Sequence, residues 1–440
     1  MYFEPKAPKN LSEVGYDPSL VLQLIGKGMY LENLETALQF SKEIKLPTNV
    51  IDEALQILTN RKQIESLGMV ANTTGGIGSL RYKLTTTGKN FVQDALNQNQ
   101  YFGPAPVPLE KYCDQVIAQS IGGERVSPEN IEEAFSDIVV PADFTRRLGP
   151  AVNSGMSILI YGPAGNGKTT VAEKVAHIFE SAIYIPHAIE VNGSIIKVFD
   201  SSVHINLEIE KPPVERRSLI RALVDKRFVP CKRPVIITGG ELNMEMLDLK
   251  FNEVSKYYEA PLHIKALNGT FIIDDFGRQQ VSPEQILNRW IVPLQSRIDF
   301  LKLHSGKTFE LPFDELVIFS TNLSPNDLMD PAFLRRIPYK LETKDPSIEA
   351  FKAIYNAVAR KAGLELTDEI FDYTVNEITQ EAGKSLAAYQ PKFIIDQVKA
   401  ACKYQGIELT FTKEVVAEGL ANLYVQDSDF KGQVGMSAPT

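Results

Sequence analysis

Short apolar runs alternate with helical patterns through the middle of this chain. From Ser157 onward, β-branched runs of three to five residues are separated by stretches whose apolar side chains recur every three or four positions. Such runs are typical of parallel strands buried beneath helices, and the alternation itself is typical of an α/β fold. We predict four of these strands, at residues 157–161, 235–238, 271–273 and 316–319. The pattern therefore indicates a parallel sheet with helices on both faces.

The two ends of the chain carry different patterns. Residues 16–97 contain three helical segments, a turn-rich stretch at 72–78 beside an alternating strand at 80–84, and a further helix. This order predicts a winged-helix-like domain. After residue 345 every pattern is helical, and Asp345 is the expected cap of the first helix. Further helices are predicted near 367–379, 391–404 and 412–424.

Changes in composition mark the borders between these regions. A polar stretch at 97–100 precedes three prolines between Gly103 and Pro108, which predicts a linker. We therefore expect a winged-helix-like domain at 1–100, a linker at 101–110, an α/β domain at 111–343, an all-α lid at 344–427 and a flexible tail at 428–440.

The charge of the chain argues against a surface built wholly for nucleic acid. The 440 residues include 46 Lys+Arg and 55 Asp+Glu, a net charge of −9. Residues 1–100 hold ten of each sign, so their net charge is zero. The exposed face of their third predicted helix carries Asp52 and Glu53, which would repel phosphates. Arg81 and Lys83 on the predicted wing are the candidate contacts to a nucleic-acid backbone. We expect this domain to bind protein, with DNA as the alternative.

The spacing of cysteine, histidine and apolar residues argues against several classes of protein. The three cysteines and five histidines show no metal-ligand spacing, which predicts reduced thiols and no metal site built from protein nitrogen and sulfur. No window approaches the ~20 apolar residues needed to cross a bilayer. We expect a cytoplasmic protein without membrane insertion.

A phosphate-binding motif follows the first predicted strand. Residues 162–169 read GPAGNGKT, a full match to the pattern G-x-x-x-x-G-K-[ST]. Its glycines let backbone N–H groups surround phosphate oxygens, and the next helix adds the positive end of its dipole. Lys168 would reach the outer phosphates, and Thr169 would bind Mg²⁺. The residues assigned to the nucleotide are Gly162, Pro163, Ala164, Gly165, Asn166, Gly167, Lys168, Thr169 and Thr170.

A pair of carboxylates ends the third predicted strand. The buried run Thr270–Ile273 leads directly into Asp274 and Asp275. In a chain that also carries a phosphate loop, Asp274 would hold Mg²⁺ and Asp275 would polarise an attacking water. The sequence therefore predicts ATP and Mg²⁺ as cofactors.

With these two elements the chain resembles the AAA+ ATPases, over roughly residues 140–405. The resemblance makes Asn322, after the fourth predicted strand, similar to the sensor 1 residue that helps to place the water. It assigns the arginine finger, which reaches the nucleotide of the neighbouring subunit, to Arg336, with Arg335 as the second candidate. It implies a homo-oligomeric ring, most often a hexamer. Lys392 stands where the family usually has the sensor 2 arginine, and lysine lacks the planar fork of that residue.

Two further segments resemble insertions of MoxR-type ATPases and bacterial enhancer-binding proteins. Residues 247–259 form a predicted hairpin before Asp274, and residues 300–311 form a second one before the fourth strand. In those families such loops line the pore or touch the client. Tyr257 and Tyr258 could then grip a polypeptide, although aromatic residues on a hairpin more often pack against their own sheet. A separate hairpin is predicted at the Asn192–Gly193 turn.

These observations lead to three functional hypotheses. The first is a Mg²⁺-dependent ATPase that forms a ring and remodels protein clients, which the N-terminal domain recruits. The second is a DNA-associated ATPase, for transcription regulation or helicase loading, that uses the winged-helix-like domain. The third is an ATP-gated scaffold with little turnover, because Asp275 stands where most of the resembled family has glutamate.

Overall fold

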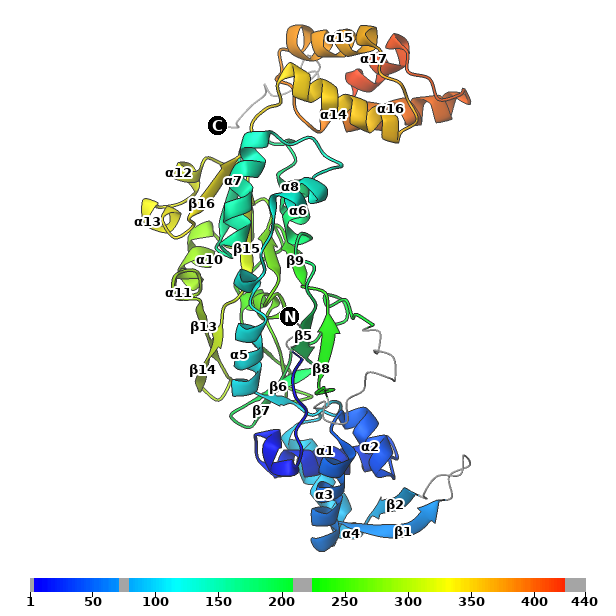
Figure 1. Cartoon of the computed structure of the whole chain (residues 1–440), viewed down its shortest axis with the longest axis vertical. Coiled ribbons are helices and arrows are strands. Elements are labelled where there is room, and N and C mark those ends of the chain that lie inside the picture. Colours follow the sequence, from blue (N-terminus) through cyan, green and yellow to red (C-terminus); the bar gives the residue numbers. More distant parts are fainter. Residues whose placement is uncertain (1–3, 71–78, 209–223, 424–440) are drawn as a thin grey trace, which may run out of the picture.

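The computed structural model describes residues 4–70, 79–208 and 224–423. The chain forms three parts stacked along one long axis, with the N-terminal domain at one end, the α/β core in the middle and a helical bundle at the other end (Figure 1). The predicted turn at 72–78 and the tail at 428–440 lie outside the described residues. Among the helices of the described ranges, none combines the length and the apolar character needed to span a membrane.

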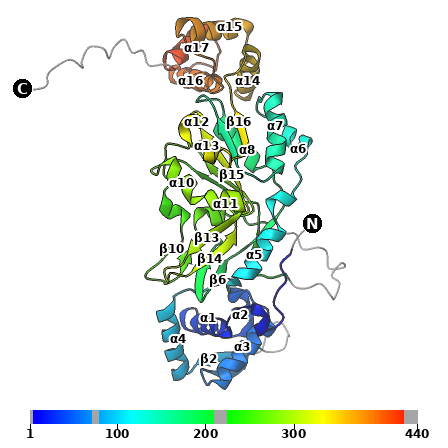
Figure 2. The same ribbon diagram turned by 90° about the vertical axis from the view of Figure 1, so that its left-hand side faces the viewer.

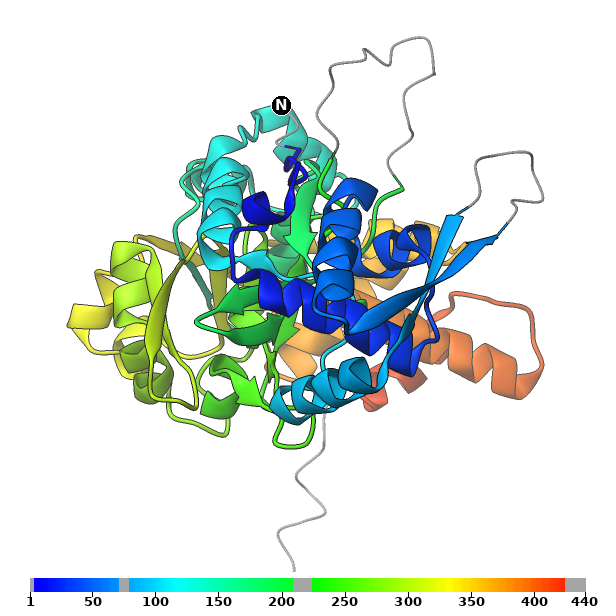
Figure 3. The same cartoon turned by 90° about the horizontal axis from the view of Figure 1, so that it is seen from below.

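The N-terminal domain consists of helices and one ribbon around an apolar core. Its elements are η1 (Leu11–Val14), α1 (Pro18–Leu31), α2 (Ala37–Ile44), α3 (Thr48–Asn60), β1 (Ile64–Val70), β2 (Ser79–Leu84) and α4 (Thr86–Gln98). β1 pairs antiparallel with β2, so that Ile64 lies opposite Leu84. The apolar face of α3, formed by Ile51, Leu55 and Leu58, is buried as its spacing predicts. Seen from below, the domain lies in front of the core with the β1–β2 ribbon at its edge (Figure 3).

A five-stranded parallel sheet forms the centre of the molecule. Its strands, in spatial order, are β16 (Tyr339–Glu342), β4 (Ile158–Tyr161), β15 (Leu316–Thr321), β12 (Thr270–Ile273) and β9 (Val235–Thr238). Four of them confirm the predicted strands. The apolar pattern does not reveal β16, because Lys340 and Glu342 interrupt it on this edge strand. β4 lies between two strands that come later in the chain, and α/β sheets commonly bind ligands beyond the strand ends at such a position.

Helices cover both faces of this sheet. Ile158 and Ile160 of β4 pack on one side against α6 (Pro128–Ala134), α7 (Ala142–Asn153) and α8 (Lys168–Ala176). Leu159 packs on the other side against α10 (Pro283–Arg289) and α11 (Ile291–Ser296), with the buried Trp290 between these two helices. Figure 2 shows the two groups of helices on opposite sides of the sheet. The predicted fold class is therefore confirmed.

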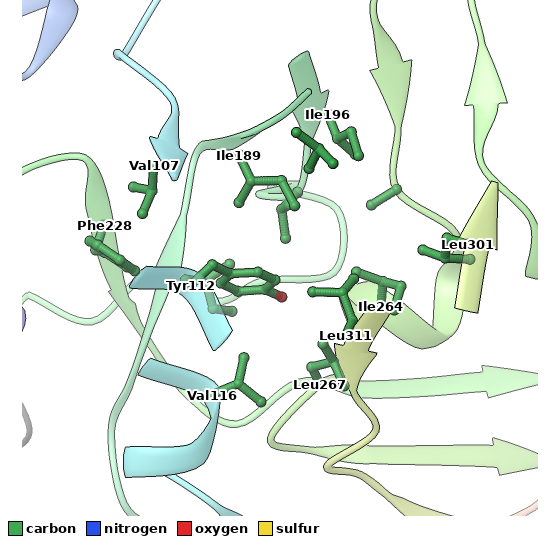
Figure 4. Close-up of a cluster of buried hydrophobic side chains, with 14 of the residues drawn as sticks. Val107, Tyr112, Val116, Ile189, Ile196, Phe228, Ile264, Leu267, Leu301 and Leu311 are labelled. Carbon is green, nitrogen blue, oxygen red and sulfur yellow. The ribbon is translucent and has the colours of Figure 1, made fainter. Parts of the chain in front are cut away.

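A second group of strands lies between the core sheet and the N-terminal domain. Its sheet has the order β10 (Lys250–Phe251), β11 (Tyr258–Glu259), β7 (Ser194–Lys197), β6 (Ala188–Val191) and β3 (Val107–Pro108), and it packs with the ribbon of β5 (Ile183–Pro186) and β8 (Phe228–Cys231). Tyr112 and Val116 of α5 (Leu109–Ala118) enter the apolar cluster between these strands (Figure 4). Residues 101–110, expected as a linker, contribute β3 to this sheet.

The predicted hairpin at Asn192–Gly193 is confirmed. β6 and β7 pair antiparallel, and the two turn residues have φ angles of 51° and 83°. Two consecutive positive φ angles are typical of the tight turn that matches the twist of the flanking strands. The hairpin belongs to the second sheet and not to the parallel core sheet.

The two predicted insertion hairpins are also present, and they contact each other. One is β10–β11, and the other pairs β13 (Ile298–Lys302) with β14 (Thr308–Pro312). The ring of His304, at the tip of the second hairpin, stacks on Phe251 of the first with 5.2 Å between centroids. The Tyr258 hydroxyl accepts the His304 backbone N–H at 2.9 Å. These contacts join the two hairpins into one unit.

The joined hairpins are docked on the N-terminal domain. The Lys256 ammonium donates to the Asn97 carbonyl of α4 at 2.8 Å, and Tyr257 packs edge-on against Tyr101 with 5.7 Å between centroids. Tyr258 is only 4% exposed. The interpretation that Tyr257 and Tyr258 grip a polypeptide is therefore wrong, because both rings are used inside the molecule.

A buried ion pair fixes the base of the second hairpin to the core. Asp299 of β13 accepts two hydrogen bonds from the Arg289 guanidinium at the end of α10, at 2.6 and 2.9 Å. Its Oδ2 also lies 2.7 Å from Nε2 of His263, and both Asp299 and His263 are fully buried. Since α10 follows the Asp274–Asp275 pair, the hairpin is attached to the segment next to the end of β12.

The C-terminal region is an all-α bundle. Its elements are α14 (Ile348–Lys361), α15 (Asp368–Asn376), the π-helical η5 (Glu377–Glu381), α16 (Gln390–Gln405) and α17 (Lys413–Ala421). The predicted helices are present, but Asp345 does not cap the first one. The Ser347 hydroxyl accepts the Ala350 N–H instead, because the Asp345 carboxylate is bound to the phosphate loop.

Candidate nucleotide-binding site

The predicted phosphate loop connects β4 to α8 and is closely packed on both sides. Gly162, Gly165 and Gly167 have φ angles of 141°, 79° and 76°, a region that residues with a Cβ rarely adopt. A Cβ at Gly162 would lie 2.1 Å from the Thr343 carbonyl oxygen, and one at Gly165 would lie 2.3 Å from the Tyr389 ring. The loop therefore requires glycine both for its conformation and for its neighbours.

Lys168 is the first residue of α8 and is turned inward. Its side chain is 6% exposed, and its ammonium donates to the carbonyls of Gly162 and Pro163 at 3.0 and 2.8 Å. Burial lowers the pKa of Lys168, while the nearby Asp275 and Asp274 carboxylates act in the opposite direction. The loop thus holds a positive charge beside the two carboxylates.

The predicted acidic residues lie at the carboxyl ends of the central strands. The Thr169 hydroxyl at the start of α8 donates to Oδ2 of Asp274 at 2.7 Å. The Asn322 amide, after β15, donates to Oδ1 of Asp275 at 3.1 Å. The structure therefore brings together residues from three strand ends that are far apart in the sequence.

These side chains fit a magnesium ion bound with a nucleotide. Mg²⁺ prefers hard oxygen ligands and is usually held by one or two protein groups together with phosphate oxygens. The adjacent hydroxyl of Thr169 and carboxylate of Asp274 are such groups. They lie at the end of the loop whose backbone would hold the phosphates.

Gln279 belongs to this site, although no sequence motif marks it. Its amide accepts the Gly277 N–H at 2.8 Å and donates to the Asp274 carbonyl at 3.0 Å. These partners are backbone groups, so the contact depends on the folded path of the chain and not on neighbouring residue types.

The helical bundle contacts the phosphate loop directly. The Asn166 amide donates to the Asp345 carboxylate at 2.7 Å and accepts the Ala388 N–H at 3.1 Å. The Tyr389 N–H donates to the Gly165 carbonyl at 2.9 Å. Lys392, the sensor 2 candidate, lies exposed in the first turn of α16, whereas Ala388 and Tyr389 are the bundle residues that touch the loop.

The two candidate finger arginines differ in their surroundings. Both follow α13 (Pro331–Leu334), which lies at the outer edge of the core, away from α8 (Figure 1). The Arg336 guanidinium donates to the Ala332 carbonyl at 2.6 Å and to Gln295 at 3.3 Å, and it lies over the Phe333 ring. Arg335 is exposed.

Comparisons with known proteins find similarity over most of the chain. Residues 347–422 match a domain of unknown function (DUF8689). The 26S proteasome regulatory subunit 6B homolog of Encephalitozoon cuniculi is 23% identical over 304 residues, which cover 66% of this chain and 63% of that protein. The 26S proteasome regulatory subunit 8 of Caenorhabditis elegans is 26% identical over 204 residues, covering 45% of this chain and 47% of that protein. The matched region thus spans less than two thirds of these relatives.

Solved structures are similar at lower identity. The RuvB Holliday junction branch migration motor of Thermotoga maritima is 15% identical with a TM-score of 0.34, covering 69% of this chain and 71% of the other. NtrX from Brucella abortus is 11% identical with a TM-score of 0.40, covering 68% of this chain and 59% of the other.

Proposed function

Because this chain belongs to the AAA+ P-loop ATPases, we propose that it binds ATP with Mg²⁺ and hydrolyses it. One observation carries the proposal. Lys168 and Thr169 of the phosphate loop lie beside Asp274 and Asp275, and Asn322 binds the second carboxylate. A lysine, a hydroxyl and two carboxylates beside a glycine loop are the groups that phosphoryl transfer to water requires.

Each group has a separate task in this proposal. The backbone N–H groups of the loop and the start of α8 bind the phosphates, and Lys168 neutralises the charge that builds up on them. Asp275 orients the attacking water and accepts its proton, and the Asn322 amide fixes the direction of that carboxylate. Thr169 and Asp274 would hold Mg²⁺, which would supply positive charge to the reaction.

Two substitutions test the nucleotide site. We expect Lys168→Ala to lose ATP binding and turnover, because the loop loses its only lysine. Asp275→Asn should keep ATP binding while its kcat falls by roughly 10²- to 10⁴-fold, since only water activation is removed. Steady-state hydrolysis and binding of a fluorescent ATP analogue measure both effects.

Lys174→Ala is the matched control on the same helix. Lys174 forms an ion pair with Asp137 away from the loop, so its removal should leave hydrolysis unchanged. Wild-type turnover by Lys168→Ala would refute the proposed site. A wild-type protein that binds Mg²⁺ and ATP without turnover, even with a partner present, would instead favour the scaffold hypothesis.

We also propose a homo-oligomeric ring in which Arg335 acts on the nucleotide of the neighbouring subunit. The sequence resemblance favours Arg336, but that guanidinium is engaged by Ala332 and Gln295 of its own chain. Arg335 is exposed and directly follows α13, which lies at the outer edge of the core (Figure 1). A group that acts on another subunit needs such a position. This contrast supports Arg335 over Arg336.

The contacts within the N-terminal domain favour protein partners over DNA. Arg81 and Lys83, the candidate DNA contacts, form ion pairs with Glu35 and Glu65 at 2.5 and 2.8 Å. The Glu53 carboxylate on α3 accepts the Leu11 N–H at 2.8 Å, so η1 covers the start of the helix that would enter the major groove. We therefore propose that this winged-helix-like domain recruits protein clients in the cytoplasm, and that the ring remodels them in a chaperone-like manner.

A further inference from the structure

Asp275 has an unusual backbone conformation for a residue with a side chain. Its φ angle is 47°, in the left-handed region where the Cβ is crowded by the backbone. Such a conformation persists where surrounding contacts fix it, and it is concentrated at functional sites. The direction of the Asp275 carboxylate therefore depends on what holds this turn.

The Gln279 amide lies inside the turn and binds its backbone. Oε1 of Gln279 accepts the Gly277 N–H at 2.8 Å. Nε2 donates to the carbonyls of Asp274, Asp275 and Gly239, at 3.0, 3.3 and 3.4 Å. The partners define the orientation of the amide, because its oxygen faces an N–H group and its nitrogen faces three carbonyl oxygens.

The outer side of the same turn is held by the two neighbouring strands. The Asp274 N–H donates to the Thr238 carbonyl of β9 at 2.8 Å, and the Phe276 N–H donates to the Ser320 carbonyl of β15 at 2.7 Å. These bonds fix the residues before and after Asp275. The inner side, toward which the Asp274 and Asp275 carbonyls point, is held by Gln279.

We infer that Gln279 is a positioning residue for the hydrolytic reaction. It acts through Asp275, by holding the positive-φ turn that directs the carboxylate toward the Asn322 amide. The inference rests on the proposed ATPase function. It does not place Gln279 in contact with the nucleotide, so the residue affects the chemical step and not the binding of ATP.

The test compares Gln279→Met with a matched neighbour. Methionine keeps the length of glutamine but removes the donor and the acceptor, so the turn can relax. A displacement of about 1 Å at a reacting group lowers the rate by up to about 100-fold. We therefore expect kcat to fall by about 10- to 100-fold while KM for ATP stays within about twofold of the wild-type value. Gln280→Met is the control, because the Gln280 side chain is exposed and its bond to Gly240 uses the backbone.

Gln279→Glu gives a second readout. The carboxylate can still accept the Gly277 N–H but turns its other oxygen toward the carbonyls of Asp274 and Asp275, which repel it. We therefore expect kcat of Gln279→Glu to fall at least as far as that of Gln279→Met, and a wild-type kcat would contradict the inference.

Hydrogen exchange separates this inference from the proposed function. The Gly277 N–H should exchange faster in Gln279→Met than in the wild type or in Gln280→Met, whether or not ATP is hydrolysed. Unchanged exchange at Gly277, an unchanged kcat, or a KM that rises in parallel with the loss of kcat would each overturn the positioning role. If the wild type bound ATP without hydrolysing it, the proposed ATPase function would be wrong. The exchange rate of the Gly277 N–H would then still show whether Gln279 holds the turn.

Discussion

At the scale of single residues, Glu315 is a buried acid with no part in the proposed reaction. It precedes β15, is 0% exposed, and neither carboxylate oxygen has a hydrogen-bond partner among the described residues. The Arg297 guanidinium donates to the Glu315 backbone carbonyl at 3.2 Å. Burial raises the pKa of Glu315 well above its usual range, against the attraction of Arg297 and with added repulsion from Asp299 and Asp314. Burial therefore favours the neutral form of the Glu315 carboxyl in the folded protein.

Glu315→Met should stabilise the protein at neutral pH. The folded state keeps a proton on Glu315 that the unfolded state releases above its ordinary pKa of 4.5. The free energy of unfolding of the wild type therefore falls as the pH rises above 4.5, by about 1.4 kcal/mol for each pH unit, until the pH reaches the pKa of Glu315 in the folded protein. The variant has no carboxyl at this position, so its stability does not fall in this way. Thermal unfolding between pH 4.5 and 8 measures the difference.

The control for Glu315→Met is the same substitution at Glu310, an exposed acid on β14. Glu310→Met should follow the pH dependence of the wild type. If Glu315→Met also followed it, the buried carboxyl would have to be ionised in the folded protein.

The residues of the site differ in how far the sequence could reveal them. Motif spacing alone predicts Lys168, Thr169 and Asp274 as site residues, because these residue types beside a strand end suit the binding of phosphate and Mg²⁺. Gln279 and Glu315 have no such signature. The role of Gln279 depends on backbone groups that two strand ends, those of β9 and β12, bring together. The cost of burying Glu315 depends on its burial, which the sequence does not indicate.

At the scale of elements, the sequence did not predict that the helical bundle is attached to the phosphate loop. Asn166 bridges Asp345 before α14 and Ala388 before α16. The apolar periodicity predicted these helices, but it carries no information on which ends face the loop. The same limit applies to β16, whose alternating sequence on a sheet edge hides it from a search for apolar runs.

Asn166→Ala should loosen the bundle without abolishing nucleotide binding. The loop N–H groups and Lys168 remain, so we expect ATP affinity to change by less than about tenfold, whereas amide exchange around residues 386–395 should become faster. Each lost hydrogen bond is worth about 1 kcal/mol. Hydrogen exchange with peptide resolution, in the absence of nucleotide, measures the effect.

Lys392→Ala is the comparison for this experiment. Lys392 lies in the same segment but is exposed, so its removal should leave the exchange of residues 386–395 as in the wild type. Equal exchange in Asn166→Ala and Lys392→Ala would show that Asn166 does not hold the bundle.

At the scale of the whole molecule, the nucleotide site and the candidate finger lie apart. The phosphate loop leads into α8, which lies below the bundle, and α13 lies at the outer edge of the core (Figure 1). Arg335 directly follows α13. In the proposed ring, one edge of each subunit faces the site of the next, so Arg335 of one subunit would lie beside the phosphate loop of its neighbour.

Mixing two inactive variants tests this arrangement. Arg335→Ala should bind ATP but lose about 10³-fold in kcat, the usual worth of an arginine finger. Lys168→Ala subunits retain Arg335, so mixed rings contain interfaces in which an intact loop meets an intact finger. We expect hydrolysis to reappear on mixing, and the absence of recovery would contradict a finger acting between subunits. Arg336→Ala should instead lower the melting temperature, because it removes contacts within one chain.

The docking of the two hairpins connects the N-terminal domain to the segment beside the nucleotide site through a chain of side-chain contacts. Asp299 ties the second hairpin to α10 beside the site, His304 ties it to the first hairpin, and Lys256 ties the first hairpin to α4. A shift of α10 during the nucleotide cycle would swing the N-terminal domain, and any client attached to it, over a longer arc than the shift itself. In the proposed function, a client bound to the N-terminal domain would move with that domain.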